Sequence, residues 1–106
     1  MEIEKIIKEC VKNGSIVWKE HILEQMRSRK IKTKEIFFAL QNFKIIETYF
    51  EDKPFPSFLI LGYTADRRPL HLVIGVNSED FELYFITSYQ PMLEIWEEGF
   101  ERRKKR

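Results

Sequence analysis

The stretch "FLILGYTADRRPLHLVIGV", residues 58–76, contains two apolar segments separated by a short polar one. The first segment is almost continuously apolar, as in a strand that is covered on both faces. In the second segment, alternation places His71 and Gly75 on the face opposite a row of leucine, isoleucine and valine side chains. The intervening "ADRRP", residues 65–69, predicts a turn. We therefore expect two successive antiparallel strands.

Two further segments on either side have the same character. "KIIETYFE", residues 44–51, is β-branched and aromatic and is broken by "DKPFPS", because proline cannot continue a strand ladder. "NSED", residues 77–80, forms a second turn before "FELYFITSY", residues 81–89. Four strands joined by short turns predict an antiparallel meander.

Helical patterns flank these strands. Apolar residues recur at helical spacing over residues 2–13, 18–29 and 33–42, with a helix stop at "NG" after the first. After Pro91, one face of a fourth expected helix carries Met92, Trp96, Phe100 and Arg103. We predict an α+β fold, in which three N-terminal helices, a four-stranded antiparallel sheet and a C-terminal helix pack together.

Size and composition favour a single domain over residues 1–106. No apolar run approaches the ~20 residues that span a bilayer, and the amino terminus does not resemble a secretory signal because acidic residues interrupt it. The single cysteine, Cys10, lies in an apolar helical stripe and suits a reducing cytoplasm. We expect a cytoplasmic protein without a membrane partner.

The net charge of +1 favours no class of partner, but its distribution is uneven. The tail "RRKKR", residues 102–106, carries five positive charges, so residues 1–101 carry +1 − 5 = −4. Two interpretations of the tail remain open. It is either a solvated helix end favoured by the helix dipole or an arm that contacts RNA.

Polar residues of the second expected helix form a row. His21, Gln25 and Arg29 follow each other at four-residue spacing along the shoulder of the apolar face. Such a row is typical of the rim of a cleft, or it frames the core. His21 is accordingly either a site residue or a half-exposed helix residue.

Other polar residues stand inside apolar strands. His71 is either a core histidine with one hydrogen bond or part of a sheet face that a ligand approaches closely. Glu47 requires a partner if it is half-buried, and Arg29 is a candidate. Thr87 and Tyr89 lie inside the last strand.

Several chemistries lack their parts in this sequence. The histidines and the cysteine have no metal-ligand spacing, and the chain has no phosphate loop or nucleophile elbow. We therefore expect no metal and no cofactor. Metal-independent RNA cleavage needs none of these parts, because the substrate supplies its own 2′-hydroxyl nucleophile and the protein only a base, an acid and cations.

The motifs together resemble a bacterial family of small domains of unknown function. The resemblance covers residues 16–103 and is carried by "HILEQMRSRKI", "IETY", "KPFPS", "LILG", "RPLHLV" and "ITSYQP", followed by a tryptophan and a basic segment. That family is similar to the RelE-type and BrnT-type toxins, which belong to a group of small metal-independent ribonucleases. The resemblance implies an mRNA endonuclease that acts on free or ribosome-bound RNA and is inhibited by an antitoxin, often a zinc-finger protein.

The resemblance matches polar positions of the family to His21, Arg29, Glu47, His71, Thr87 and Tyr89. The polar row of the second expected helix and the strand histidine then lead to a hypothesis about roles. The residues expected to act in catalysis are His21, Arg29, His71 and Tyr89, with one histidine as base, the other histidine or Tyr89 as acid, and Arg29 as transition-state stabiliser. The residues expected to bind substrate are Gln25, Glu47, Thr87 and Arg103. One departure from the RelE-type pattern is that the strands carry few lysines and arginines.

Two alternatives come from other classes. The first is a non-catalytic module that binds RNA or a protein through the same groove, with Phe55, Phe58, Tyr63 and Tyr84 as stacking residues or as core. The second, an enzyme acting on a small metabolite, lacks a cofactor motif.

Overall fold

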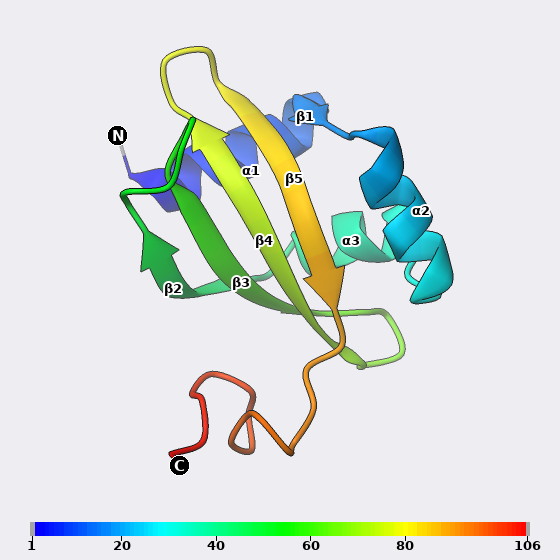
Figure 1. The fold of residues 1–106 in the computed structure, drawn as a ribbon. Helices are drawn as coiled ribbons and strands as arrows, with labels where there is room; N and C mark the ends of the chain where they lie inside the picture. The colour runs from blue at the N-terminus through cyan, green and yellow to red at the C-terminus, as the bar shows by residue number, and fades with distance from the viewer. Residues whose placement is uncertain (1, 106) are drawn as a thin grey trace.

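The computed structural model describes residues 2–105, which fold into three helices and a five-stranded sheet (Figure 1). The elements in chain order are α1 (Ile3–Asn13), β1 (Ile16–Val17), α2 (Glu20–Ser28), α3 (Thr33–Ala39), β2 (Lys44–Tyr49), β3 (Ser57–Tyr63), β4 (Pro69–Asn77) and β5 (Glu82–Tyr89). The α+β class, the three helices and the four strands that follow α3 are as predicted, but β1, between α1 and α2, was not predicted.

The sheet has the strand order β1-β5-β4-β3-β2. Strands β2 to β5 form the predicted antiparallel meander, in which Leu61 of β3 pairs with His71 of β4. The prediction of four antiparallel strands is wrong in one respect, because β1 pairs in parallel with β5. β1 contains only two residues, too few to produce an alternating pattern in the sequence.

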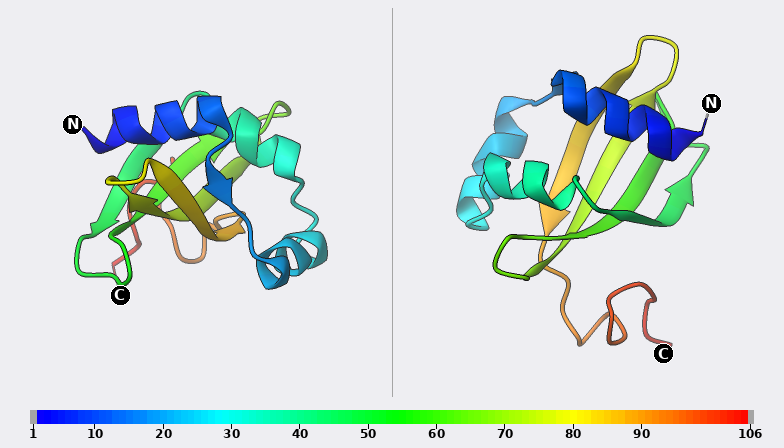
Figure 2. Two further views of the ribbon diagram at one scale, coloured as in Figure 1. Left: turned by 90° about the horizontal axis from the view of Figure 1, so that it is seen from above. Right: turned by 180° about the vertical axis from the view of Figure 1, so that it is seen from behind.

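Helices α1 and α3 cover one face of the sheet, whereas α2 stands beside β5 at its edge (Figure 2). The core lies between this face and the helices and includes the expected α1 side chains Ile6, Ile7, Cys10 and Val11. The packing of α3 is especially close at Gly62 of β3. A Cβ atom at this glycine would lie 2.6 Å from the carbonyl oxygen of Ala39.

Both β2 and β5 contain a β-bulge. On β2, Ile45 pairs with Ile60 but the next pair is Glu47 with Leu59; on β5, the register shifts in the same way next to Ile86. Since side chains of a strand alternate, each extra residue moves the side chains after it to the other face of the sheet. Glu47 and Thr87 therefore point away from the helices.

The predicted C-terminal helix is absent from the described residues. Residues 91–105, here called the C-terminal segment, instead form turns closed by a Trp96–Arg103 bridge and by a 2.8 Å hydrogen bond from the Glu97 amide to the Arg102 carbonyl. The apolar residues have helical spacing, but Gly99 (φ 91°) and Phe100 (φ 60°) adopt left-handed conformations that reverse the chain.

The C-terminal segment lies on the face of the sheet opposite α1 and α3 (Figure 2, left). It buries Trp96 to 2% exposure, together with Leu59 and Leu61, which are not part of the helix-side core. The basic tail, described up to Lys105, is exposed, but it is not the helix end that was expected. None of the helices in residues 2–105 has the length and apolarity that crossing a membrane requires.

The close approach at Gly62 leads to a stability prediction. Gly62→Ala should lower the free energy of unfolding by about 1–3 kcal/mol, because the new methyl group meets backbone atoms that cannot rotate away. Urea denaturation followed by circular dichroism measures this change. Gly75→Ala on β4 is the matched control, since its Cβ would meet no atom closer than 3.7 Å. Equal midpoints for the two variants would contradict the packing described.

Candidate functional site

The face of the sheet opposite α1 and α3, here called the open face, carries His71, Val73 and Gly75 of β4. Their partners on β5 are Tyr89 beside His71, Thr87 beside Val73, and Tyr84 beside Gly75. The β5 bulge places Tyr89 and Thr87 on this face. The open face therefore gathers most of the polar residues that the sequence singled out.

His71 is completely buried, and both of its ring nitrogens have partners. Nε2 lies 2.8 Å from the carbonyl oxygen of Phe100, and Nδ1 lies 3.2 Å from the hydroxyl of Tyr89. Because a carbonyl only accepts, Nε2 carries the proton, and Nδ1 accepts the hydrogen bond that the Tyr89 hydroxyl donates. Burial lowers the pKa of His71, so the ring is neutral near pH 7.

The C-terminal segment covers His71 with an aromatic and a cationic side chain. The indole of Trp96 packs edge-on against the imidazole, with 4.4 Å between the ring centroids. The guanidinium of Arg103 lies 4.6 Å from the centroid of the same indole. Arg103 also donates to both carboxylate oxygens of Glu47, over 3.0 and 3.2 Å.

Glu47 is the carboxylate of this group. The Tyr49 hydroxyl donates to it as well. Burial by itself would raise the pKa of Glu47, but the hydrogen bonds from Arg103 and Tyr49 and the charge of Arg103 outweigh it and lower that pKa. Glu47 is therefore ionised near pH 7, whereas burial raises the pKa of Tyr89 and keeps its proton in place.

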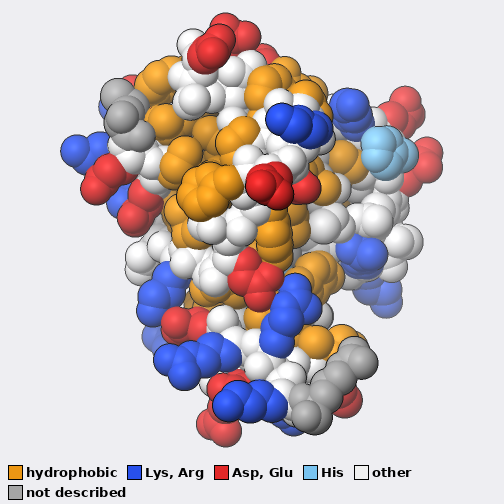
Figure 3. All heavy atoms as spheres, turned by 60° about the vertical axis from the view of Figure 1, so that its left-hand side comes forward, with side chains coloured by type: hydrophobic (Ala, Val, Ile, Leu, Met, Phe, Trp, Pro, Cys, Tyr) orange, Lys and Arg blue, Asp and Glu red, His pale blue; other side chains and the backbone are white. Residues whose placement is uncertain are grey.

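These side chains are called the polar cluster below: Glu47, Tyr49, His71, Tyr89 and Arg103. They come from three strands and the C-terminal segment. Figure 3 shows that Lys and Arg side chains gather in the lower part of the molecule, where the C-terminal segment lies. Chemically, the cluster offers an ionised carboxylate, a protonated phenol and a guanidinium. It consists of two hydrogen-bonded sets, Glu47 with Tyr49 and Arg103, and His71 with Tyr89, and Trp96 contacts both sets.

A second group ties α2 to β5 on the same face. Arg29 Nη1 donates to the Thr87 hydroxyl over 3.1 Å and to the Ser88 carbonyl over 2.6 Å. The Thr87 hydroxyl in turn donates to Gln25 Oε1 over 2.7 Å. The charge of Arg29 opposes the rise in the pKa of Tyr89, so Arg29 lies near the polar cluster.

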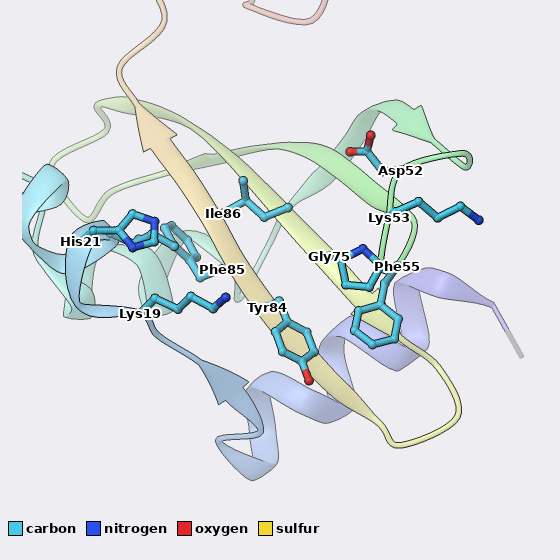
Figure 4. Close-up of a pocket in the computed structure, with 11 residues that line it drawn as sticks. Lys19, His21, Asp52, Lys53, Phe55, Gly75, Tyr84, Phe85 and Ile86 are labelled. Carbon is cyan, nitrogen blue, oxygen red and sulfur yellow. The ribbon is translucent and has the colours of Figure 1, made fainter.

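His21 does not join either group. It is exposed on α2 and lines a pocket of ≈ 440 Å³ together with Lys19, Phe55 and Tyr84 (Figure 4). His71 does not line this pocket. The expected roles of one histidine as base and the other as acid require both imidazoles in one site, and the structure does not bring them together. Eight residues separate His21 from Arg29, so they lie at opposite ends of α2, about 12 Å apart.

Other expectations about the site have mixed outcomes. Arg29 is not the partner of Glu47, because Arg103 occupies that position. Sequence reasoning missed Tyr49 and Trp96 as members of the site. Tyr49 follows Glu47 at the two-residue spacing of one strand face, which is a usable signal. Trp96 gave no such signal, because the segment that places it was expected to be a helix.

The class of protein is thus a small α+β domain whose mixed sheet has helices on one face and a polar cluster on the other. Within residues 2–105, no group of three or more histidine, cysteine, aspartate or glutamate side chains could hold a metal ion. Residues 18–90 match the family model described as domain of unknown function DUF4258, and the chain belongs to that family. Neither the curated proteins nor the solved structures compared with the chain include a match. The family match ends just before the C-terminal segment.

The buried, neutral state of His71 predicts how stability depends on pH. Because its pKa is lowered in the folded protein, the unfolded chain binds more protons in acid, and stability should fall as the pH decreases below about 6.5. The contribution of one proton is at most about 1.4 kcal/mol per pH unit. Urea midpoints measured at several pH values between 5 and 8 give the slope.

His71→Gln should flatten this slope between pH 5 and 6.5, because glutamine keeps a donor for the Phe100 carbonyl but does not titrate. His21→Gln is the matched control, since His21 is exposed on α2. If His21→Gln alone removed the slope, the assignment to His71 would be refuted.

Proposed function

We propose that this protein is a metal-independent endoribonuclease whose active site is the polar cluster. The observation that carries the proposal is that an ionised Glu47, bonded to Arg103, and a protonated Tyr89, bonded to His71, lie on the same face and are joined through Trp96, which contacts both His71 and Arg103. RNA cleavage requires a base, an acid and cations around the phosphate, and each has a counterpart here.

In the proposed reaction, Glu47 takes the proton of the 2′-hydroxyl. The 2′-oxygen then attacks the adjacent phosphorus, and the bond from phosphorus to the 5′-oxygen breaks. The Tyr89 hydroxyl turns its proton from His71 Nδ1 toward that 5′-oxygen and donates it there. The products are a 2′,3′-cyclic phosphate and a 5′-hydroxyl. Glu47 and Tyr89 regain their starting states by exchanging protons with water. The cleavage step needs no reactant other than the RNA itself.

The arginines stabilise the negative charge of the pentacoordinate phosphorus. Arg103 uses Nε and Nη2 on Glu47, and the planar guanidinium has further N–H donors for a phosphate oxygen. His71 is a positioning residue, because its Nδ1 holds the Tyr89 hydroxyl while neither nitrogen faces solvent. The earlier hypothesis of a histidine base is thereby replaced by a carboxylate base.

The proposal extends to the biological role through the resemblance to RelE-type and BrnT-type toxins. The chain would be the cytoplasmic toxin of a type II toxin–antitoxin pair, with mRNA as substrate. Its antitoxin would cover the open face, and a zinc-finger protein fits the resemblance. Sequence motifs support this part, whereas the geometry of the polar cluster supports the chemistry.

A second candidate is a non-catalytic RNA- or protein-binding module. It is favoured by the fact that the site residues already bind one another. Arg103 neutralises Glu47, and both ring nitrogens of His71 have partners within the protein. A site saturated by its own contacts is suited to binding by shape and charge. Cleavage in a metal-free assay separates the two candidates.

The purified protein should cleave single-stranded RNA in EDTA and leave 2′,3′-cyclic phosphate ends. Glu47→Gln and Tyr89→Phe should each lower the cleavage rate by about 100-fold or more, as expected for loss of a general base or acid. Gel analysis of end-labelled RNA measures the rate. Glu24→Gln and Tyr63→Phe are matched controls, because both residues are exposed outside the polar cluster.

Unchanged cleavage by both cluster variants would refute this mechanism. Binding of RNA by the wild-type protein without any cleavage would favour the module. Expression of the chain alone in a bacterium tests the toxin role separately, since Glu47→Gln should relieve growth arrest and Glu24→Gln should not.

A further inference from the structure

The pocket beside His21 lies on the open face but apart from the polar cluster. Its lining comes from α2, from the β2–β3 connection and from β4 and β5. Figure 4 shows Lys19 and His21 on one side, Lys53 and Phe55 on the other, and Ile86 between them. The pocket is therefore an open groove across β5, here called the trough, with Lys19 and His21 on one side and Lys53 on the other.

Two aromatic rings form one side of the trough. Phe55 and Tyr84 stack on each other, with 5.1 Å between centroids and 24° between planes. The Tyr84 hydroxyl donates to Glu82 over 2.8 Å, which holds the ring in place. Gly75 beneath leaves the trough without a side chain at that point. Flat aromatic surfaces of this kind bind unpaired nucleic-acid bases by stacking.

The charges of the trough favour an anion. Lys19, His21 and Lys53 line the trough together with one carboxylate, that of Asp52, which accepts a hydrogen bond from the Ser57 hydroxyl. In Figure 4 the Lys19 side chain extends toward Tyr84, so the phosphate of a base that stacks on Tyr84 lies on the side of Lys19, whereas Lys53 extends outward and must turn to reach it. Aromatic platforms combined with lysines match single-stranded nucleic acid better than a duplex, whose bases are already stacked.

The trough and the polar cluster lie on the same face of the sheet, at different places along β4 and β5. Gly75 and His71 share the open face four residues apart, which corresponds to about 13 Å along a strand. Between them, Val73 pairs with Thr87, and Thr87 is bonded to Arg29. Cationic side chains thus mark the trough, the middle of the face and the cluster, in a line that a short run of nucleotides can follow.

We infer that the trough lined by Lys19, Lys53, Phe55 and Tyr84 is a binding subsite for an unpaired base and its phosphate in a single-stranded RNA whose neighbouring linkage lies at the polar cluster. This inference rests on the proposed function, because it assigns the trough to the same substrate. It adds that the enzyme selects single-stranded RNA through a stacking contact outside the reacting groups.

The test uses an oligonucleotide with 2′-O-methyl groups, which lacks the nucleophile and therefore reports binding without cleavage. Fluorescence anisotropy should show tighter binding of this single strand than of the same sequence as a duplex. Tyr84→Leu should weaken binding by about 10-fold through the loss of stacking. Lys53→Glu should also weaken it and make it less dependent on salt.

Matched controls are Tyr63→Leu and Lys34→Glu, which change exposed residues outside the trough and should bind as the wild type does. Circular dichroism shows whether each variant is folded. Lys53→Glu changes a residue on an exposed loop, so it still tests the inference if Tyr84→Leu does not fold. A titration with adenosine 5′-monophosphate distinguishes RNA from a free nucleotide as the ligand.

Four outcomes decide the matter. Selective loss of single-strand binding in both trough variants supports the inference. It supports the inference even if the protein cleaves no RNA, because the absence of cleavage would reject only the nuclease proposal. Unchanged binding in both trough variants overturns the inference even if cleavage is observed. Preference for the duplex, or binding of the mononucleotide as tight as that of the oligonucleotide, also overturns it.

Discussion

Two β-bulges determine which side chains the sheet presents to solvent. Without the extra residue on β2, Glu47 would share the face of Ile45 and point into the core beneath the helices. Without the extra residue on β5, Thr87 and Tyr89 would share the face of Phe85. A carboxylate and a threonine buried in an apolar core without partners are costly, so the bulges make this sequence compatible with this sheet.

The β5 bulge has a cost of its own. It turns Ser88 into the core, where the hydroxyl is 1% exposed and has no hydrogen-bond partner among the described residues. The same register brings Tyr89 beside His71 and Thr87 beside Arg29. One unsatisfied hydroxyl is thus exchanged for two hydrogen-bonded pairs on the open face.

Local patterns were sufficient for most of the fold. The apolar stripe of α1 and the alternation of β4 arise because one face of each element is buried along its length. Apolar residues therefore recur in the sequence at the period of a helix or of a strand. The C-terminal segment followed a helical period equally well, but Gly99 and Phe100 reverse the chain there. Instead of forming a helix, the segment buries Trp96 against His71, a residue distant in sequence.

The site was less predictable than the fold because its geometry depends on register. The sequence identified His71, Glu47, Thr87 and Tyr89 as polar residues among apolar neighbours. It did not show the bulges, which decide their direction, or Arg103 as the partner of Glu47, since that pair spans 56 residues. Of the polar row that the sequence placed on the second helix, Arg29 and Gln25 are both hydrogen-bonded to Thr87, whereas His21 lies near the other end of the helix.

The attachment of the C-terminal segment has a consequence for how the molecule responds to ionic strength. Its contacts with β2 are ion pairs at the surface, Lys44 with Glu101 and Glu47 with Arg103, and dissolved salt screens such pairs. Its contacts with β4 are the burial of Trp96 against His71 and the buried hydrogen bond between His71 Nε2 and the Phe100 carbonyl, and dissolved salt screens such buried contacts little. At high salt the segment would therefore be held mainly at His71.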